Sequence, residues 1–265
     1  MVSVNNFFNN PNIKTIAELG HFKVLEYQKD ITMDPGMAAS LFFCDKMGVR
    51  KRQVAVELAK SSVTVSSGAM QWFTGNIESK TGIKGAGDLM GKMIKGSVTG
   101  ESAIKPEYSG EGILVLEPTY KFILLENVEN WNGGLVLDDG LFLACDSTVE
   151  QKINKRSNFS SAIAGGQGLF NLSLNGKGVA VLESPIPREE LIEITLENDT
   201  IKIDGNYAIA WSGSLQFTVE RSSKSLLGSA ANGEGLVNVY RGTGKILMAP
   251  VNSGFSFANM LSARA

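Results

Sequence analysis

A short motif that begins with glycine recurs along the chain, and it constrains the fold more than any other feature. Three copies begin at Gly112, Gly178 and Gly244, each 66 residues after the one before, and an earlier copy begins at Gly20. Each of the last three copies forms a Gly-x-Gly pair, continues into apolar residues and is followed by a proline. Self-similarity at a fixed period indicates a repeat architecture. We therefore predict similar units arranged head to tail.

A second glycine lies inside each unit, between two segments in which apolar residues alternate with polar ones. These glycines are Gly68, Gly140 and Gly205. Residues two apart point to the same face of a β-strand, and glycine accepts the positive φ that tight turns require. The pattern predicts a hairpin turn at each of the three positions.

Together these patterns predict an all-β protein of three tandem, similar β modules packed as one compact unit. Glycine is abundant, with 29 residues, as expected for a chain rich in turns. The predicted division is an N-terminal extension over 1–19, modules over 20–111, 112–177 and 178–254, and a tail over 255–265. The first module carries an insertion of about 20 residues around Phe42 to Arg52.

Helix signals are few. Pro187 to Leu191 predicts a helical turn, and the segments 88–95 and 157–164 predict short helices. Ile31 to Gly36 is predicted to be a strand that ends in a turn.

The charge balance argues against a global attraction to nucleic acid or anionic lipid, because 25 basic and 27 acidic side chains leave a net charge of −2. The N-terminus lacks the basic and apolar regions of a signal peptide. The longest near-apolar stretch, Met37 to Cys44, is less than half the ~20 residues that a membrane span needs. Cys44 and Cys145 lie far apart in apolar surroundings, which predicts two buried thiols. A reduced, cytoplasmic protein is the expectation.

The sequence contains few of the residue patterns that enzymes use in catalysis. His21 is the only histidine, whereas metal sites in β-barrels use several, and no Gly-x-Ser-x-Gly motif is present. The Gly-Lys pairs lack the Ser or Thr of a phosphate-binding loop. Adjacent carboxylates, such as Asp138 and Asp139, lie in predicted turns and do not indicate a glycosidase cleft. We therefore expect no catalytic residues, no metal and no cofactor.

A basic, partly apolar segment follows the second strand of each predicted module. Together the three segments carry +8, so the rest of the chain carries −10. Basic segments with apolar side chains suit an anionic membrane surface, an acidic partner or a nucleic-acid backbone. The candidate binding residues lie in the first segment and are Lys84, Met90, Lys92, Met93 and Lys95. The alternative is that the apolar residues cap the modules and the lysines only solvate the loops.

Stacking on nucleic acid would require exposed aromatic residues among basic ones. Trp72, Trp131 and Trp211 have few basic neighbours and are predicted to lie in the core or between modules. The residues therefore do not indicate nucleic-acid binding.

The order of these motifs resembles the altered-inheritance-of-mitochondria 24 family. The resemblance runs from about Gly20 to Pro250 and is carried by Gly68-Ala69-Met70, by 99–102 (Thr-Gly-Glu-Ser), by Asp146-Ser147, and by the Gly-x-Gly pairs with their prolines. It implies a fold similar to the trp RNA-binding attenuation protein, with a β-sandwich or double-stranded β-helix module. It also implies a homo-oligomer, expected to be a trimer, and no enzymatic activity. Mitochondrial members are associated with inner-membrane organisation, which implies a scaffold role.

Three functional hypotheses follow. The first is a non-enzymatic, oligomeric scaffold or binding protein that acts at a membrane surface or on a protein partner. The second is an RNA-binding regulator, by analogy of fold with the attenuation protein, although no residues match the binding set of that protein. The third is a small-molecule enzyme, which would require a deep pocket with convergent polar groups.

Overall fold

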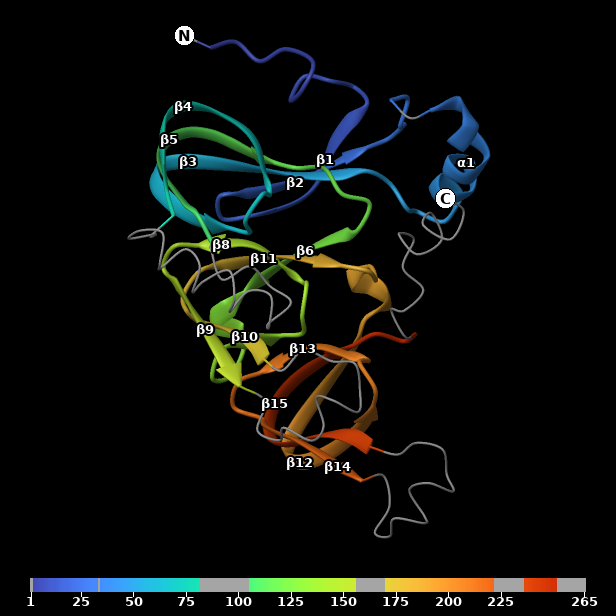
Figure 1. The fold of residues 1–265 in the computed structure, drawn as a ribbon, viewed down its shortest axis with the longest axis vertical. Coiled ribbons are helices and arrows are strands. Elements are labelled where there is room, and N and C mark those ends of the chain that lie inside the picture. The colour runs from blue at the N-terminus through green and yellow to red at the C-terminus, as the bar shows by residue number, and fades with distance from the viewer. Residues whose placement is uncertain (1, 33, 82–104, 156–169, 222–235, 252–265) are drawn as a thin grey trace, which may run out of the picture.

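The strands lie in successive layers that follow the chain from one end of the molecule to the other. Figure 1 shows this order in a computed structural model, with the N-terminal strands at the top and the C-terminal strands at the bottom. The structure describes residues 2–32, 34–81, 105–155, 170–221 and 236–251.

The described strands are β1 (Ile13–Leu19), β2 (Phe22–Tyr27), β3 (Arg52–Val65), β4 (Met70–Lys80), β5 (Glu107–Leu116), β6 (Phe122–Asn127), β7 (Leu135–Leu137), β8 (Phe142–Asp146), β9 (Val149–Lys155), β10 (Phe170–Gly176), β11 (Val179–Ser184), β12 (Ile192–Asp204), β13 (Ala208–Ser212), β14 (Gln216–Arg221) and β15 (Leu236–Met248). Within the same residues, the helical elements are the α-helix α1 (Ala38–Lys46) and three 3-10 turns, η1 (Pro35–Met37), η2 (Val128–Asn130) and η3 (Arg188–Glu190).

Two antiparallel sheets contain all of these strands. The first has the order β1-β2-β3-β8-β11-β6, with β5 paired to β3 and β4 paired to β5. The second has the order β12-β15-β13-β7-β10-β9, with β14 paired to β15. Pairs such as β3 with β8 and β7 with β13 join parts of the chain that are far apart in sequence. The molecule is therefore mostly β, and the predicted all-β class is confirmed at that level.

Several strands in the middle of both sheets are buried on both faces. On β11, Leu182 faces a central hydrophobic cluster, while the adjacent Val181 faces a cluster nearer the N-terminus. On β7, Leu137 faces the central cluster, while Val136 faces a third cluster nearer the C-terminus. Strands with two buried faces read as continuous apolar runs and not as alternating ones. The core is thus divided by the two sheets into three large clusters.

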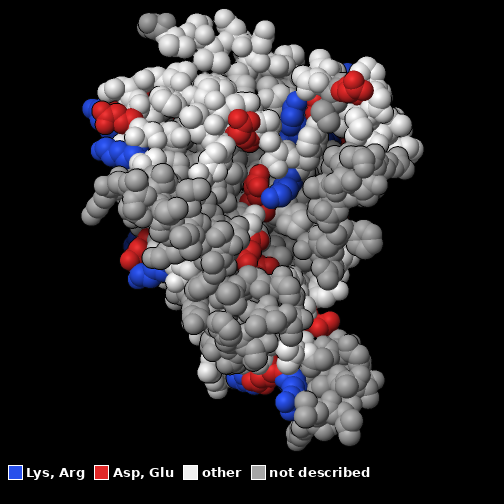
Figure 2. Space-filling view, in the orientation of Figure 1, with Lys and Arg blue, Asp and Glu red and all other residues white. Residues whose placement is uncertain are grey.

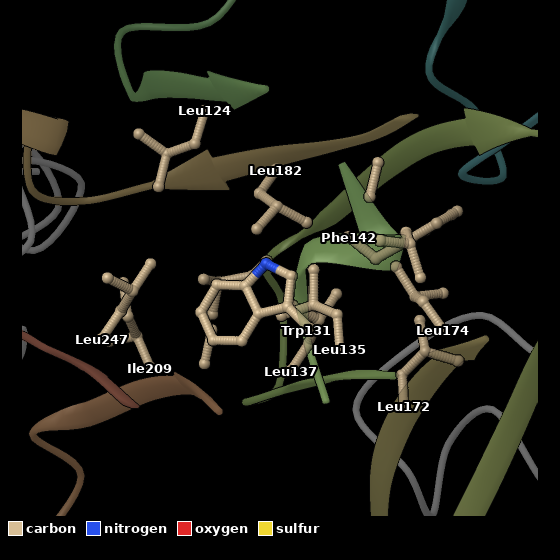
Figure 3. Packing of buried hydrophobic residues seen from close by; sticks show 14 of the residues in the cluster. Leu124, Trp131, Leu135, Leu137, Phe142, Leu172, Leu174, Leu182, Ile209 and Leu247 are labelled. Atoms are coloured by element: carbon tan, nitrogen blue, oxygen red, sulfur yellow. The ribbon is translucent and has the colours of Figure 1, made fainter. Parts of the chain in front are cut away.

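The central cluster is organised around Trp131, which follows η2 and is 5% exposed. Figure 3 shows its indole surrounded by leucines from several strands, among them Leu135, Leu137 and Leu182. Its Nε1 donates a hydrogen bond to a carboxylate oxygen of Glu126, at 3.3 Å. The ring is therefore buried with its one polar group satisfied.

The predicted glycine turns exist, but they are not hairpins. Gly68, Gly140 and Gly205 adopt φ values of +80°, +78° and +48°. Among the described strands, however, the two that flank each glycine do not pair with each other. β5 lies between β3 and β4, and β15 lies between β12 and β13. The hairpin prediction is wrong because a turn glycine determines a local change of direction and does not determine which strand pairs with which.

The first Gly-x-Gly pair, Gly110 and Gly112, marks a place where backbones approach closely. Gly110 on β5 has a φ of +140°, and a Cβ atom there would lie 2.0 Å from the carbonyl oxygen of Asn76 on β4. Only glycine tolerates such an approach together with that φ. Gly176 and Gly178 likewise lie where β10 ends and β11 begins. The first copy of the motif therefore has a steric cause in the fold, whereas a Cβ atom on Gly242 of the last copy would meet nothing closer than 3.6 Å.

Local predictions hold in part. Cys44 and Cys145 are buried, and so are Trp131 and Trp211, as predicted, while Trp72 is half-buried. The 3-10 turn η3 confirms the helical turn predicted near Pro187, whereas the helices predicted over 88–95 and 157–164 lie outside the described residues. The strand predicted from Ile31 to Gly36 is wrong, because η1 begins there.

Candidate functional site

The segment between β2 and β3, residues 28–51, leaves both sheets and carries η1 and α1; we call it the α1 segment. Figure 1 shows α1 at the edge of the molecule, to one side of the strands. The predicted insertion in the first module falls here, but the sequence reasoning missed its helix.

Signals for this helix are present at both ends. Asp34 accepts a hydrogen bond from the Gly36 amide at 2.7 Å and is followed by Pro35, the combination that favours a helical start. At the other end Gly48 takes a φ of +72°, and its amide donates to the Asp45 carbonyl at 3.1 Å. The Val49 amide donates to the Cys44 carbonyl at 2.8 Å. This pair of bonds with a left-handed glycine is a common C-terminal cap, so the helix is defined locally.

A buried ion-pair network holds the α1 segment against the first sheet. Arg52 on β3 lies 2.7 Å from the Glu26 carboxylate on β2, and both side chains are largely buried. Arg52 also donates to the Gly48 carbonyl at 3.0 Å and lies over the ring of Phe122 at 4.3 Å. Arg50 donates to Asp45 at the end of α1, at 2.9 Å. Because these cations reach both the sheet and the helix, they fix the position of α1.

A second group centres on Asp30. Its carboxylate accepts hydrogen bonds from Tyr120, from Thr32 at 2.8 Å and from Lys51 at 3.2 Å. Burial alone would raise the pKa of Asp30, but these bonds outweigh burial and lower that pKa to about 2. Burial and the bond to Asp30 together raise the pKa of the Tyr120 phenol. The group is therefore an ionised carboxylate with neutral and cationic donors around it.

A cavity of about 310 Å³ lies between α1 and this polar group, a size in the range of small-molecule sites. Its lining combines apolar side chains, such as Leu41 and Phe42, with the charged residues Asp30, Arg50 and Lys51. These three charged side chains already form ion pairs with protein groups. The charged side chains that line the cavity are therefore neutralised by one another or by neighbouring protein groups.

Large apolar side chains of the α1 segment are exposed. Phe42 and Phe43 are 58% and 63% exposed, Met47 is 77% exposed, and Ile31 is 84% exposed. Cys44 is the one residue of α1 that is buried. Over α1, the described surface in Figure 2 is largely uncharged. We call Ile31, Phe42, Phe43 and Met47 the α1 apolar group.

No constellation for acid–base or metal chemistry is found in the described part of the chain. No group of three or more potential metal ligands occurs there. Nε2 of His21 lies 3.9 Å from Oδ1 of Asp146, and no hydrogen bond from His21 to a serine or cysteine is found among those residues. Burial raises the pKa of the Cys44 thiol, and it raises that of Cys145 to about 12. Both thiols are therefore protonated and poorly nucleophilic at neutral pH.

A second cavity, of about 380 Å³, lies at the Gly68 and Gly140 turns. It is lined by two carboxylates, Glu117 and Glu183, and Glu183 is paired with Lys121 at 3.0 Å. Ser66 and Ser67 also line it, but Ser66 donates to the Phe142 carbonyl and neither serine is hydrogen-bonded to a carboxylate among the described residues.

The site residues predicted from the sequence, Lys84, Met90, Lys92, Met93 and Lys95, all lie outside the described residues. The structure does describe the strands on either side of the three basic segments. β4 pairs with β5, β9 with β10, and β14 with β15, so each segment joins two strands that are paired with each other.

These features define a mostly β protein of two curled sheets with one helical insertion that exposes apolar side chains. Comparison with known proteins is consistent with this class. The family model described as "Mitochondrial biogenesis AIM24" matches residues 46–251. The chain belongs to the AIM24 family, as the resemblance implied.

Two similar proteins come from Streptococcus pyogenes. An uncharacterised protein of a serotype M6 strain is 32% identical over 200 residues, which cover 72% of this chain and 77% of that protein. A crystal structure of another S. pyogenes protein is similar with a TM-score of 0.58 and 28% identity, covering 82% of this chain and 95% of that one. Across the described residues, none of the helices has the length and apolar character needed to span a bilayer.

Proposed function

We propose that this protein is a non-enzymatic scaffold or binding protein, acting at a membrane surface or on a protein partner, and that it docks through the α1 apolar group. The observation that carries the proposal is the exposure of two adjacent phenylalanines, Phe42 and Phe43, on a helix that is fixed in place by a buried ion pair and a partly exposed one. Grouped apolar side chains on a rigid surface typically mark interaction sites.

The energetic reason is simple. Burial of apolar surface stabilises a fold by about 25 cal/mol per Å², and exposed phenylalanine forgoes that gain. The α1 segment nevertheless uses its local caps and its ion pairs to keep Phe43 and Met47 in water. A partner that covers them would recover the lost free energy.

Site-directed photo-crosslinking tests this function. A photoreactive phenylalanine analogue at position 43 is expected to capture lipid or one specific protein in cells of the host. The same analogue at position 73 on β4 is the matched control, because Phe73 is also exposed, at 40%, but lies away from α1. Equal labelling from both positions, or none from position 43, would contradict the proposal. Capture of RNA from position 43 would favour the RNA-binding alternative.

The division into three tandem modules is part of this proposal. It is supported by the recurrence of one pairing pattern, in which a third strand lies between a first and a second strand, although β5 crosses the first predicted boundary and β11 falls in the third predicted module. β5 lies between β3 and β4, β11 between β6 and β8, and β15 between β12 and β13.

We further propose that the chain forms a homo-oligomer, with a trimer as the expected form. Light scattering on the purified protein should then give about three times the 28.4 kDa of one chain. A mass of one chain at micromolar concentration would contradict the oligomer.

The basic segments are proposed as a second contact with the partner. Their equivalent positions, each between two paired strands, support this role. Changing Lys92→Glu with Lys95→Glu should weaken association and reduce its dependence on salt. The control Lys60→Glu with Lys177→Glu changes charge equally at exposed described positions and should have little effect. Association that is the same in both variants would remove the segments from the proposal.

A further inference from the structure

We propose that one face of the first sheet is a docking site for a phenylalanine-bearing segment, that the N-terminal residues of this chain occupy it, and that the same residues of a second copy replace them in the assembled protein. The inference rests on the proposed homo-oligomer and names a contact between its copies. We call residues 2–12 the N-terminal arm. Figure 1 shows the arm outside the strands, at the top of the molecule.

Neighbouring strands of the first sheet carry an apolar patch under the arm. On β3 and β5, Val54 and Leu114 face the cluster nearer the N-terminus, whereas the adjacent Ala55 and Val115 face a separate, smaller cluster. Ala55 lies opposite Val115, and Val115 lies opposite Trp72 on β4. These side chains therefore form one row across three strands. We call the patch the Phe7 seat; it consists of Leu25, Ala55, Trp72, Ile113 and Val115.

Phe7 fills this seat. It is the one residue of the arm that is buried, at 9% exposed. Its ring lies 5.2 Å from that of Trp72, and the two planes are inclined by 71°, the edge-to-face arrangement that aromatic pairs favour. Leu25, Ala55 and Val115 are at most 2% exposed. A segment that takes the place of the arm must therefore bring an aromatic side chain.

The arm is held in the seat by side-chain packing alone. Among the described residues, no hydrogen bond of residues 2–9 reaches the sheet. The Asn6 amide donates to the Asn9 side chain at 2.8 Å, and the Asn10 amide donates to the Phe7 carbonyl at 3.2 Å, so these bonds stay within the arm. Ordering a chain segment costs conformational entropy, and here the burial of one ring is the main term that offsets it. The arm is therefore poised to leave its seat.

Asn12 fixes the base of the arm just after the end of β2. Its Nδ2 donates to the Lys29 carbonyl at 2.7 Å, and its Oδ1 accepts from the Lys29 amide at 2.8 Å. The Asn12 carbonyl also accepts from the Gln28 amide at 2.8 Å. Release of Phe7 would therefore swing residues 2–9 about this point and leave β1 paired with β2.

A second copy fits the released seat because every copy carries an arm with the same Phe7. Exchange of identical elements between copies remakes the contacts of the closed form, so it costs little. In a separate copy, the tethered arm has a high effective concentration at its own seat and returns to it. In a homo-oligomer, neighbouring arms compete for the same seats. The arm has no charged side chain, so we expect the contact to be insensitive to salt.

The first experiment adds a peptide of residues 1–12 to the full-length chain carrying Phe7→Ser, in which the seat has lost its own ring. The readout is the NMR signal of the Trp72 indole, which borders the seat. We expect this signal to move, and a peptide with the same Phe7→Ser change to have no effect. The unchanged chain and the control Phe8→Ser should need at least about tenfold more peptide, because their own Phe7 competes. Circular dichroism should show all three chains folded.

The second experiment detects exchange between copies. A photoreactive phenylalanine analogue replaces Phe8, which is 44% exposed and whose ring lies 4.8 Å from that of Phe7. This chain is mixed with an isotopically heavy chain that lacks the analogue. At the concentration where light scattering shows the oligomer, we expect crosslinks from position 8 of the light chain to β4 or β5 of the heavy chain. Adding Phe7→Ser to the light chain should remove them.

The inference fails if the Trp72 signal of the Phe7→Ser chain ignores the peptide, or responds no more strongly than that of the unchanged chain. It also fails if all crosslinks join light chain to light chain. If light scattering shows an oligomer in that last case, the proposed homo-oligomer stands and only the exchange is wrong. If light scattering shows single chains, both are wrong. The proposed docking through α1 is judged separately, by the crosslinks from position 43.

Discussion

The central core cluster and the α1 segment use the same kinds of apolar residues in opposite ways. Around Trp131, leucines from several strands are almost fully buried, and the cluster is held by packing. In the α1 segment, Phe43 and Met47 are mostly exposed, and the segment is held at its base by charged groups, among them the buried pair of Glu26 on β2 and Arg52 on β3. The hydrophobic effect therefore stabilises the first region, while ion pairs and helix caps position the second.

This difference has a functional consequence. A region held by apolar packing cannot offer its apolar side chains to a partner without unfolding. A region held by polar interactions can, because its apolar side chains contribute little to its own stability. The comparison therefore predicts that stability and binding are separable in this protein, and four substitutions test it.

The largest effect is expected from Trp131→Ala. Removing this indole leaves a cavity among packed leucines, which should lower the free energy of unfolding by about 4 kcal/mol. Urea unfolding followed by circular dichroism measures it. In the same assay Phe43→Ala should cost less than about 0.5 kcal/mol, because Phe43 is mostly exposed. If the two variants lost the same free energy of unfolding, the proposed difference in how the two regions are stabilised would be wrong.

The next effect is expected from Arg52→Ala, which leaves the Glu26 carboxylate buried without its main partner. Breaking a buried ion pair from one side should cost about 3 kcal/mol. The control is Lys121→Ala, which breaks a pair with Glu183 of similar length, at 3.0 Å, but with Lys121 half exposed. Its cost should stay below about 1 kcal/mol. A cost for Arg52→Ala no larger than for this control would contradict the buried network.

A smaller effect should appear as a pH dependence from Asp30. Its folded-state pKa, about 2, lies below the ordinary value of 3.8, so ionised Asp30 stabilises the fold above the ordinary pKa. That contribution, about 2 kcal/mol, should be lost as the pH falls from 5 towards 2. The free energy of unfolding, measured across this pH range, should fall less steeply in Asp30→Asn than in the unchanged protein. Parallel curves would show that Asp30 titrates normally.

The smallest effect is expected from Gly48→Ala. A Cβ atom there would meet nothing within 4 Å, so the cost, about 1 kcal/mol, comes only from the φ of +72°. Gly68→Ala has an equally open position and a φ of +80° and should cost the same. Amide hydrogen exchange separates the two. Gly48→Ala should speed exchange in α1 alone, whereas Gly68→Ala should affect the sheets around β3 and β4.

Much of the local structure could be predicted from the sequence. The turn glycines and the buried cysteines are where the residue pattern indicated. The helix between β2 and β3 also has signals in the sequence, because Asp34-Pro35 favours a helix start and Gly48 a helix end. From the sequence, the apolar run between them was considered only as a membrane span, for which it is too short. The exposure of Phe42 and Phe43 could not be predicted, because an apolar helix next to a β-rich chain is expected to pack on it.

The sequence by itself determined the positions of the bends and turns, because glycine and proline act through the backbone of one or two residues. The apolar runs of β7 and β11 leave no polar side for water, but from the sequence the segment of β7 was described as alternating, and neither strand was identified as buried on both faces. Only the tertiary structure decided that β5 and β15 lie between strands that precede them, and that Arg52 and Glu26 tie the end of the α1 segment to the first sheet. Strand pairing and ion pairing join residues distant in sequence, and the free energy of each contact depends on what the rest of the fold brings beside it.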